Sequence, residues 1–459
     1  MTTAKAPPPS PLLRPGLHSS PSGIAWPALP DPTSALVLAL QYQFEHSQWW
    51  SAQELQAQQF RQLARLLDHA RRSVPFYKKR LGRTAKKELT LKDWQTIPIL
   101  TRREVQQAGP ALASRNIPKD HGPPNPVQSS GSTGQPIKTL ETGLSRLFFR
   151  ALNLRRFLWQ KADLSGAAAT IRQTRPGTGL PPRGTREGHW AVGFDTGPAF
   201  SLSLDTTTDQ QIAWLMRHKP NLLLSYPSIL GALAERVLRD DIAMPWLKTV
   251  NAFGEVLSAE IKALARQAWG VAVNDLYSAI EVGVIALQCP EHEHYHVAAE
   301  SIFVEVLDDA GRPCAPGEVG RVILTPLHNF AYPLIRYEIG DYAEVGPPCP
   351  CGRGLPVLTR ILGRERNMFV FPGGERRWPA FDKFLDIDIL GQFQVIQKTP
   401  RQLDVVLAVS RPLDSADEDR LRQALQADLG HPFKIDFTIV DEVPRAASGK
   451  FESTRCLVD

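Results

Sequence analysis

Short apolar runs alternate with helical patterns between residues 129 and 286, and this alternation limits the possible folds more than any other feature. The run at 222–225 precedes a helical pattern at 229–238, and the run at 249–253 precedes one at 259–269. Strands that alternate with helices in this way form βαβ units, in which the strands are parallel and the helices cover the sheet. The chain is therefore predicted to form a large, multi-layered α/β domain with a mostly parallel sheet.

The segments on either side of this region predict other kinds of structure. Residues 53–74 carry apolar side chains at helical spacing, and Pro75 ends this amphipathic helix because it disfavours helical geometry at Val74. Two apolar runs, at 302–307 and 319–325, flank a turn-rich segment and indicate an antiparallel pair. The rest of the chain predicts a small α+β module with a hairpin at 371–374, strands at 403–409 and 434–440, and a helix at 418–429.

These patterns divide the chain into three parts. Nine prolines in the first 33 residues are typical of a disordered tail, which we place at 1–34. A large domain is expected at 35–362, with a β-rich part at about 287–360. A small C-terminal domain is expected at 363–459.

Composition and charge narrow the classes of function. A hydrophobic fraction of 42% and a charged fraction of 22% are typical of a globular protein with a sizeable core. The net charge of +6 suits an enzyme that binds anionic nucleotides and carboxylates, and the scattered basic residues argue against a nucleic-acid partner. No apolar run approaches the roughly 18 residues of a membrane span, so no membrane partner is expected. Five cysteines in a chain of this length favour a reducing, cytoplasmic location over a disulfide framework.

A loop rich in hydroxyl groups and glycine is the sharpest local signal. Two glycines allow a tight backbone bend, so that hydroxyls and backbone N–H groups can surround phosphate oxygens. The loop lacks the glycine-lysine-serine/threonine ending of a Walker motif, and taken alone it equally fits a polar surface loop. Its residues are Ser129, Ser130, Gly131, Ser132, Thr133, Gly134, Gln135, Pro136, Ile137 and Lys138.

Cysteines and histidines gather in a second pattern. Cys289 is followed by three histidines, His292, His294 and His296, and a Cys349-Pro350-Cys351-Gly352 turn lies about 60 residues further on. Three thiolates and one imidazole would form a tetrahedral Cys₃His zinc site, which would be structural because no open position remains for water. The alternative is a set of unconnected surface histidines and reduced cysteines; Cys314 and Cys456 have no visible partner.

Together with later segments, the loop resembles the adenylate-forming superfamily of acyl–coenzyme A synthetases and adenylation domains, and within it the phenylacetate–coenzyme A ligase branch. The resemblance extends from about residue 50 to the end of the chain. Its motifs occur in the family's order: the phosphate loop at 129–138, the adenine-binding turn at 251–255, an aromatic-to-glutamate motif at 277–281, a ribose-binding motif at 336–341, a hinge at 363–364 and a lysine loop at 444–452.

The resemblance implies a role for each motif residue. In the large domain, Phe253, Gly254 and Glu255 would form the adenine-binding turn, Tyr277 and Ser278 would lie by adenine, Glu281 would hold Mg²⁺ and Asp341 would accept hydrogen bonds from ribose. In the small domain, Arg364 would belong to the hinge and Lys450 would neutralise charge on the reacting oxygens. By the same analogy, the zinc ligands would be Cys289, His296, Cys349 and Cys351.

The sequence departs from the family pattern at two places. The residue before Glu281 is usually a hydroxyl residue that helps to fix the α-phosphate, and here it is Ile280. The hinge of the family is usually aspartate or lysine followed by aspartate, and here it is the pair Arg366-Asn367. The first change is expected to slow adenylation or reshape the pocket, and the second alters the residues about which the small domain would turn.

The implied reaction is an ATP-dependent ligation in two steps. A carboxylic acid would form an acyl-adenylate with release of pyrophosphate, and a thiol, expected to be that of coenzyme A, would then displace AMP. Two alternatives remain open: transfer to an amine, a carrier protein or a protein cysteine, and a nucleotide-binding protein without turnover. An aryl or other apolar acid would be bound by aromatic side chains drawn from Phe149, Trp190, Phe194, Trp214 and Tyr226.

Overall fold

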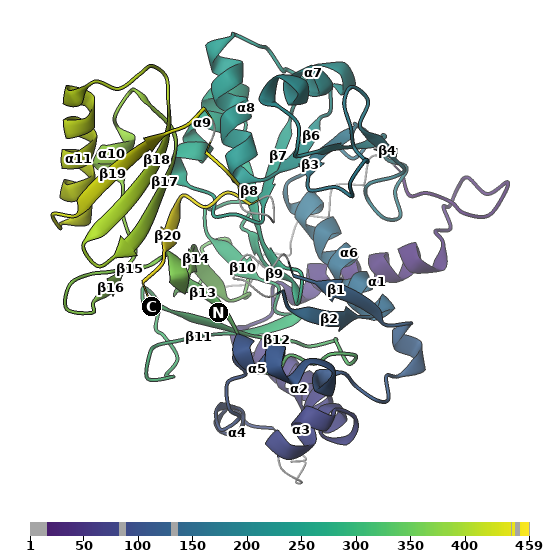
Figure 1. The fold of residues 1–459 in the computed structure, drawn as a ribbon. Helices are drawn as coiled ribbons and strands as arrows, with labels where there is room; N and C mark the ends of the chain where they lie inside the picture. The colour runs from purple at the N-terminus through teal and green to yellow at the C-terminus, as the bar shows by residue number, and fades with distance from the viewer. Residues whose placement is uncertain (1–15, 82–88, 130–135, 442, 446–449, 459) are drawn as a thin grey trace.

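The computed structural model describes residues 16–81, 89–129, 136–441, 443–445 and 450–458 (Figure 1). Its first part is helical, and the amphipathic helix expected at 53–74 is confirmed as α2. A capping box of Ser51 and Glu54 starts α2, and extended backbone at Val74 ends it before Pro75. The helices are α1 (Pro32–Ser47), α2 (Ala52–Ser73), α3 (Pro75–Arg80), α4 (Leu91–Gln95) and α5 (Arg102–Ala108), followed by 3₁₀ turns at Gly109–Leu112 and Lys119–His121.

The described part of the proline-rich segment contacts the large domain. Leu17 forms an isolated antiparallel bridge with Phe194, and the backbone N–H of His18 donates to the carbonyl of Gly193. The Asp31 side chain then caps the first turn of α1 by accepting from the N–H groups of Thr33 and Ser34.

A twelve-stranded sheet forms the centre of the large domain, and the predicted βαβ units make up one part of it. Neighbouring strands in the order β5-β3-β6-β7-β8 are all parallel. Their carboxyl ends therefore meet along one edge, where parallel sheets bind ligands. The strands are β3 (Ala168–Arg172), β5 (Ala199–Ser203), β6 (Leu222–Ser225), β7 (Thr249–Phe253) and β8 (Val273–Ala279), and the helices are α6 (Gly143–Trp159), α7 (Thr208–His218), α8 (Pro227–Arg239) and α9 (Ala259–Trp269).

The remainder of this sheet is antiparallel. It continues from β8 in the order β9-β10-β14-β13-β12-β11, and β4 (Thr185–Glu187) lies at the opposite edge. The predicted pair at 302–307 and 319–325 is confirmed as β11 and β12. The strands are β9 (Gly283–Gln288), β10 (Tyr295–Val297), β11 (Ile302–Leu307), β12 (Val319–Pro326), β13 (Tyr337–Val345) and β14 (Val357–Arg364), and a separate hairpin pairs β1 (Asn125–Gln128) with β2 (Lys138–Glu141).

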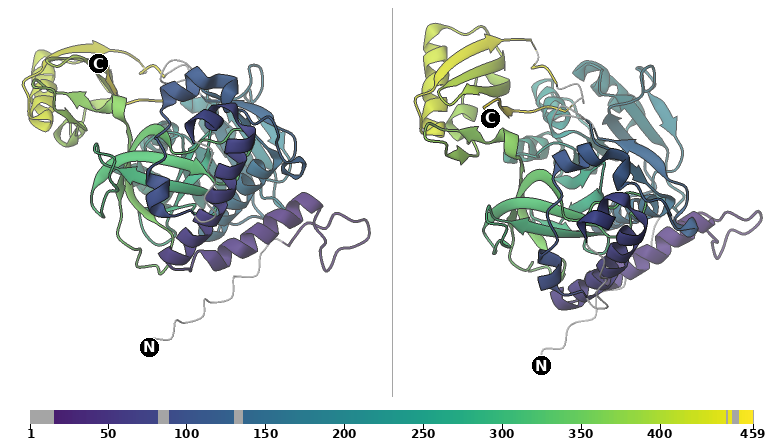
Figure 2. Two further views of the ribbon diagram at one scale, coloured as in Figure 1. Left: turned by 90° about the horizontal axis from the view of Figure 1, so that it is seen from below. Right: turned by 60° about the horizontal axis from the view of Figure 1, so that its bottom comes forward.

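The C-terminal residues form a smaller body beside the large one (Figure 2). Its four-stranded sheet has the order β19-β18-β17-β20 and packs around a hydrophobic core of its own. In Figure 1 it lies next to α8 and α9, and the expected α/β class with a small α+β part is confirmed. Its elements are β15 (Phe369–Val370), β16 (Arg376–Arg377), α10 (Asp382–Leu385), β17 (Leu390–Thr399), β18 (Gln402–Val409), α11 (Ser415–Leu429), β19 (Lys434–Ile439) and β20 (Thr454–Cys456), after a 3₁₀ turn at Glu365–Asn367.

No helix among the described residues is both long and apolar enough to cross a lipid bilayer.

Candidate active site and metal cluster

The turn after β7 lies at the carboxyl edge of the parallel strands and brings both bodies together. Gly254 has a φ of +81°, a backbone conformation that residues other than glycine rarely adopt. A Cβ atom on Gly254 would lie 3.1 Å from the Tyr226 ring and 3.7 Å from Cε of Lys450. The ring of Tyr226 also lies against Phe253, with centroids 4.7 Å apart. Glycine is therefore favoured here by the positive φ and by the close approach of the Tyr226 ring, and Lys450 lies within ordinary contact distance of the same turn.

Tyr277 and Asp341, predicted to bind adenine and ribose, are directly connected. The Tyr277 hydroxyl donates to Oδ2 of Asp341 at 2.8 Å, and Nε of Arg364 lies 3.4 Å from Oδ1. Burial raises the pKa of Tyr277 above its ordinary value, and the Asp341 charge raises it further, so the phenol stays protonated. A nucleotide that bound Asp341 would share this carboxylate with both partners.

The carboxylate of Glu281 is buried at the start of the β8–β9 connection. Its side chain is 5% exposed, and Nη1 of Arg102 lies 3.7 Å from its Oε1. The same Arg102 nitrogen is 3.5 Å from the Tyr337 hydroxyl. Sequence reasoning missed Arg102, because it lies outside all the motifs that resemble the family. An arginine in the first turn of a short helix gave no signal of its own.

Lys450 reaches this site from the small body. Burial lowers the pKa of Lys450 below its ordinary value, and Arg364 lowers it further, whereas the carboxylates of Asp341, Glu255 and Glu281 act in the opposite direction. These four charged groups come from β7, β8, β13 and β14 or the turns that follow them. The structure therefore brings the predicted catalytic lysine together with the predicted magnesium, ribose and hinge residues.

Glu255, predicted as part of the adenine-binding turn, is held by backbone groups on both sides of the junction. Its Oε2 accepts from the N–H of Ser228 at 3.0 Å, and its Oε1 accepts from the N–H of Phe451 at 2.6 Å. Burial raises the pKa of Glu255 and the two N–H groups oppose that shift.

Only the base of the predicted phosphate loop is described. The Ser129 N–H donates to the carbonyl of Ile137 at 2.9 Å, and the Ser129 hydroxyl accepts from the Ile137 N–H at 2.8 Å. These bonds close the loop between β1 and β2, and Lys138 is exposed at the start of β2. The remaining predicted phosphate-binding residues, Ser130, Gly131, Ser132, Thr133 and Gly134, lie outside the described residues.

Of the other predicted residues, some lie at the site and others lie in the core or on the surface. Ser278 is half-buried near the end of β8, and Ile280 is 56% exposed beside Glu281. Of the predicted aromatic pocket residues, Tyr226 contacts the Gly254 turn, whereas Phe194 and Trp214 lie in the core. Phe149 is exposed, and Trp190 donates from its indole N–H to the Gly166 carbonyl.

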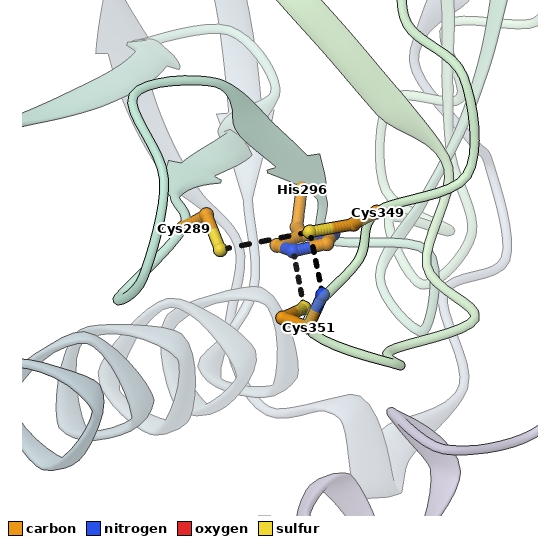
Figure 3. Close-up of side chains that lie close together, drawn as sticks. All are labelled: Cys289, His296, Cys349 and Cys351. Carbon is orange, nitrogen blue, oxygen red and sulfur yellow. Dashed lines mark hydrogen bonds between the residues drawn. The ribbon is translucent and has the colours of Figure 1, made fainter.

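The predicted zinc residues lie together (Figure 3). One ligand atom from each of the four residues lies within 4.8 Å of every other one. The sulfur atoms of Cys289 and Cys349 are 3.9 Å apart, and Nε2 of His296 is 3.4 Å from the sulfur of Cys351. His294 belongs to this surrounding too, because its Nε2 lies 2.9 Å from the Cys349 sulfur.

The chain around this cluster joins several elements. The Cys289 loop leads into β10, the Cys349–Cys351 turn precedes β14, and the N–H of Gly354 donates to the carbonyl of Gln48 at the end of α1. The Arg353 guanidinium lies 4.9 Å from the ring centres of both Trp49 and Trp159. A metal ion there would therefore connect the sheet with α1 and α6.

Comparison with known proteins agrees with the resemblance drawn from the motifs. Residues 382–455 match the family model of the CapK C-terminal domain. A phenylacetate–coenzyme A ligase of Thermus thermophilus is 25% identical over 350 residues, which cover 70% of this chain and 73% of the relative. A crystal structure of 2-hydroxyisobutyryl–coenzyme A ligase in the postadenylation state, 17% identical, aligns with a TM-score of 0.72 over 90% of this chain and 92% of the other.

The same 2-hydroxyisobutyryl–coenzyme A ligase also allows a comparison of reaction states. Its structure in the thioesterification state, 18% identical, aligns with a TM-score of 0.58 over 90% of this chain and 91% of the other. The overall fold of this chain therefore aligns with a higher TM-score to the postadenylation structure of that enzyme.

Proposed function

We propose that this protein activates a carboxylic acid with ATP and transfers the acyl group to coenzyme A. The chain has the fold of adenylate-forming coenzyme A ligases and resembles phenylacetate–coenzyme A ligases. One observation carries the proposal. Lys450, from the small body, lies beside the Gly254 turn and near Asp341 and Glu281 of the large body and Arg364 at the expected hinge. Cationic and hydrogen-bonding groups from distant segments converge where anionic reactants must meet.

In the first step, a carboxylate oxygen attacks the α-phosphorus of ATP. The bond from this phosphorus to its bridging oxygen breaks, and pyrophosphate leaves with the electron pair. Attack of one anion on another is unfavourable unless cations are fixed nearby. Lys450 and Arg102 would supply that charge, and Asp341 would orient the ribose.

The residues present also fit the magnesium ion that the resemblance implies. Glu281 offers a buried, hard oxygen ligand, and the cation Arg102 is 3.7 Å away rather than in tight contact. Bound at Glu281, Mg²⁺ would neutralise phosphate charge and orient the leaving pyrophosphate.

In the second step, the thiolate of coenzyme A attacks the acyl carbon and AMP leaves with the carboxyl oxygen. The small domain would turn about Arg364 and the Arg366-Asn367 pair to make room for the thiol. An apolar acid would suit this place, because the Tyr226 and Phe253 rings lie against each other beside the Gly254 turn and offer apolar surface. Exclusion of water by these rings would protect the reactive anhydride from hydrolysis.

We also propose that Cys289, His296, Cys349 and Cys351 hold a structural zinc ion. The donor set of three sulfurs and one nitrogen is one that tetrahedral zinc prefers, and the four donor atoms already lie within 4.8 Å of one another. The short distance from His294 to Cys349 suits a hydrogen bond to a metal-bound thiolate.

The products identify the acceptor. The protein is incubated with ATP, Mg²⁺ and a panel of aryl and aliphatic acids, and then with coenzyme A, an amine or a phosphopantetheinylated carrier protein. We expect mass spectrometry to find AMP and an acyl–coenzyme A thioester. If the acyl group is found only on the amine or on the carrier protein, that compound and not coenzyme A is the acceptor.

Replacing Ile280 with threonine is expected to raise the rate of acyl-adenylate formation by about tenfold. Threonine would restore a hydroxyl that can donate to the α-phosphate, a charge-assisted bond of about 1.5–3 kcal/mol. Ile280→Val is the matched control, because valine has the shape of threonine without the hydroxyl. Equal rates in the two variants would show that a side chain at position 280 does not contact the α-phosphate.

The pH dependence of adenylation provides a test of Lys450. Lys450 must be protonated to stabilise the phosphate, and burial lowers its pKa below the ordinary value of 10.5. The kcat/KM for adenylation is therefore expected to fall as pH rises through a pKa below that of an exposed lysine. Lys450→Arg keeps its charge and should lack this alkaline decrease. If the arginine variant shows the same alkaline decrease, the decrease comes from the titration of a group other than Lys450.

A further inference from the structure

The carboxylate of Glu255 lies at the junction of the two bodies and is 5% exposed. Its two oxygens have different partners. Oε2 accepts from the N–H of Ser228, at the N-terminus of α8 in the large body, and Oε1 accepts from the N–H of Phe451 in the small body. The helix N-terminus favours a negative charge at this position, so the large body holds Glu255 whether or not the small body is docked.

Arg445 strengthens the same junction from the small body. Its Nη1 donates to the Ser228 hydroxyl at 2.7 Å and lies 3.6 Å from Oε1 of Glu255. Residues on both sides of Lys450 therefore contact Glu255, Arg445 through its side chain and Phe451 through its backbone N–H. Lys450 lies between these attachments, with its Cε near Gly254.

We propose that Glu255 is a positioning residue that docks the lysine loop for adenylation and releases it for thioester formation. The proposal rests on the proposed function and adds a role for a residue otherwise expected only to border adenine. The Phe451 N–H directly follows Lys450 in the chain, so its bond to Glu255 fixes the backbone that carries the catalytic ammonium group. When the small domain turns, Phe451 and Arg445 leave, whereas Ser228 remains.

This division predicts that Glu255 is needed for one half-reaction only. Replacement by glutamine leaves one acceptor oxygen for two N–H donors and turns an NH₂ group toward the other donor. In Glu255→Gln we expect acyl-adenylate formation to slow by about 10- to 100-fold, the effect of losing a buried charge-assisted hydrogen bond. With a synthetic acyl-adenylate at saturating concentration, reaction with coenzyme A should slow far less than adenylation does, because Phe451 no longer contacts Glu255 in that step. The matched control is Glu344→Gln, whose carboxylate bonds Arg360 within the large body.

Amide hydrogen exchange tests the docking without any substrate. In the wild type the Phe451 amide should exchange slowly, and in Glu255→Gln it should exchange much faster. The Val395 amide, which donates to the Ser453 carbonyl inside the small body, should be unchanged and so report that this body remains folded. Because this arm needs no acid, it separates a failure of the docking role from a failure of the proposed ligase activity.

Two results would overturn the inference. One is an equal loss of both half-reactions in Glu255→Gln, since that would indicate a general structural role. The other is an unchanged exchange rate at Phe451, which would show that the bond to Glu255 does not hold the loop in solution.

Discussion

Replacing Lys450 with alanine is expected to slow acyl-adenylate formation by roughly 10²- to 10³-fold, the loss typical when one preorganised group that stabilises developing charge is removed. Lys450 is the cation of the small body that lies among Asp341, Glu255 and Glu281 at the Gly254 turn. Without its ammonium group, charge that builds up on the α-phosphate oxygens has less compensation. Single-turnover formation of the acyl-adenylate, with an acid that the protein accepts, measures the effect.

The half-reactions separate this role from a structural one. Thioester formation from a synthetic acyl-adenylate should be nearly unchanged in Lys450→Ala, because that step does not form a bond at phosphorus. Lys434→Ala is the control, since Lys434 lies on β19 of the same body, 73% exposed and away from the junction. If the Lys450→Ala variant adenylates at the wild-type rate, Lys450 does not take part in the adenylation step.

Loss of the metal cluster is expected to cause the largest change in stability. In Cys349→Ser, or after chelation, we expect the free energy of unfolding to fall by about 4 kcal/mol or more, because structural metal sites contribute binding energy to folding. For a domain of this size that corresponds to a decrease in Tm of about 8 °C or more, at roughly 2 °C per kcal/mol. Differential scanning calorimetry of the metal-loaded protein provides the measurement.

The cysteines outside the cluster offer a matched control for this effect. Cys314 lies in the connection between β11 and β12 and contributes no ligand atom to the cluster. Cys314→Ser should therefore keep both its metal content and its Tm close to those of the wild type. Elemental analysis that finds no zinc in protein purified without chelators, with Cys349→Ser as stable as the wild type, would contradict a structural metal.

The parallel half of the fold was accessible from the sequence because each strand and helix there has a local pattern. The apolar run at 249–253 and the helical pattern at 259–269 appear as β7 and α9 with the expected bounds. The small body was predictable for the same reason, as α11 and β19 show. The order β9-β10-β14-β13 could not be derived, because it depends on pairing between residues far apart in the chain.

Motifs in the order of the family identified most residues of the candidate site, but the sequence did not predict which of these residues contact one another. The motif at 277–281 predicts an aromatic ring near adenine, whereas the bond from the Tyr277 hydroxyl to Asp341 joins segments 64 residues apart. Arg102 was missed because its partner Glu281 is likewise distant in sequence. Spacing could not distinguish His294 from His296 either, because both rings lie near a cysteine sulfur. His296 is the one whose ligand atom lies within 4.8 Å of those of all three cysteines.

The measurement that tests the central claim most directly is exchange of [³²P]pyrophosphate into ATP by the wild-type protein, across a panel of aromatic and aliphatic acids. Adenylation and its reversal are the only steps it requires, so it does not depend on which acceptor the protein uses. We predict exchange that depends on the added acid and on Mg²⁺. Binding of ATP without exchange for any acid would contradict acid activation and would favour a nucleotide-binding protein without turnover.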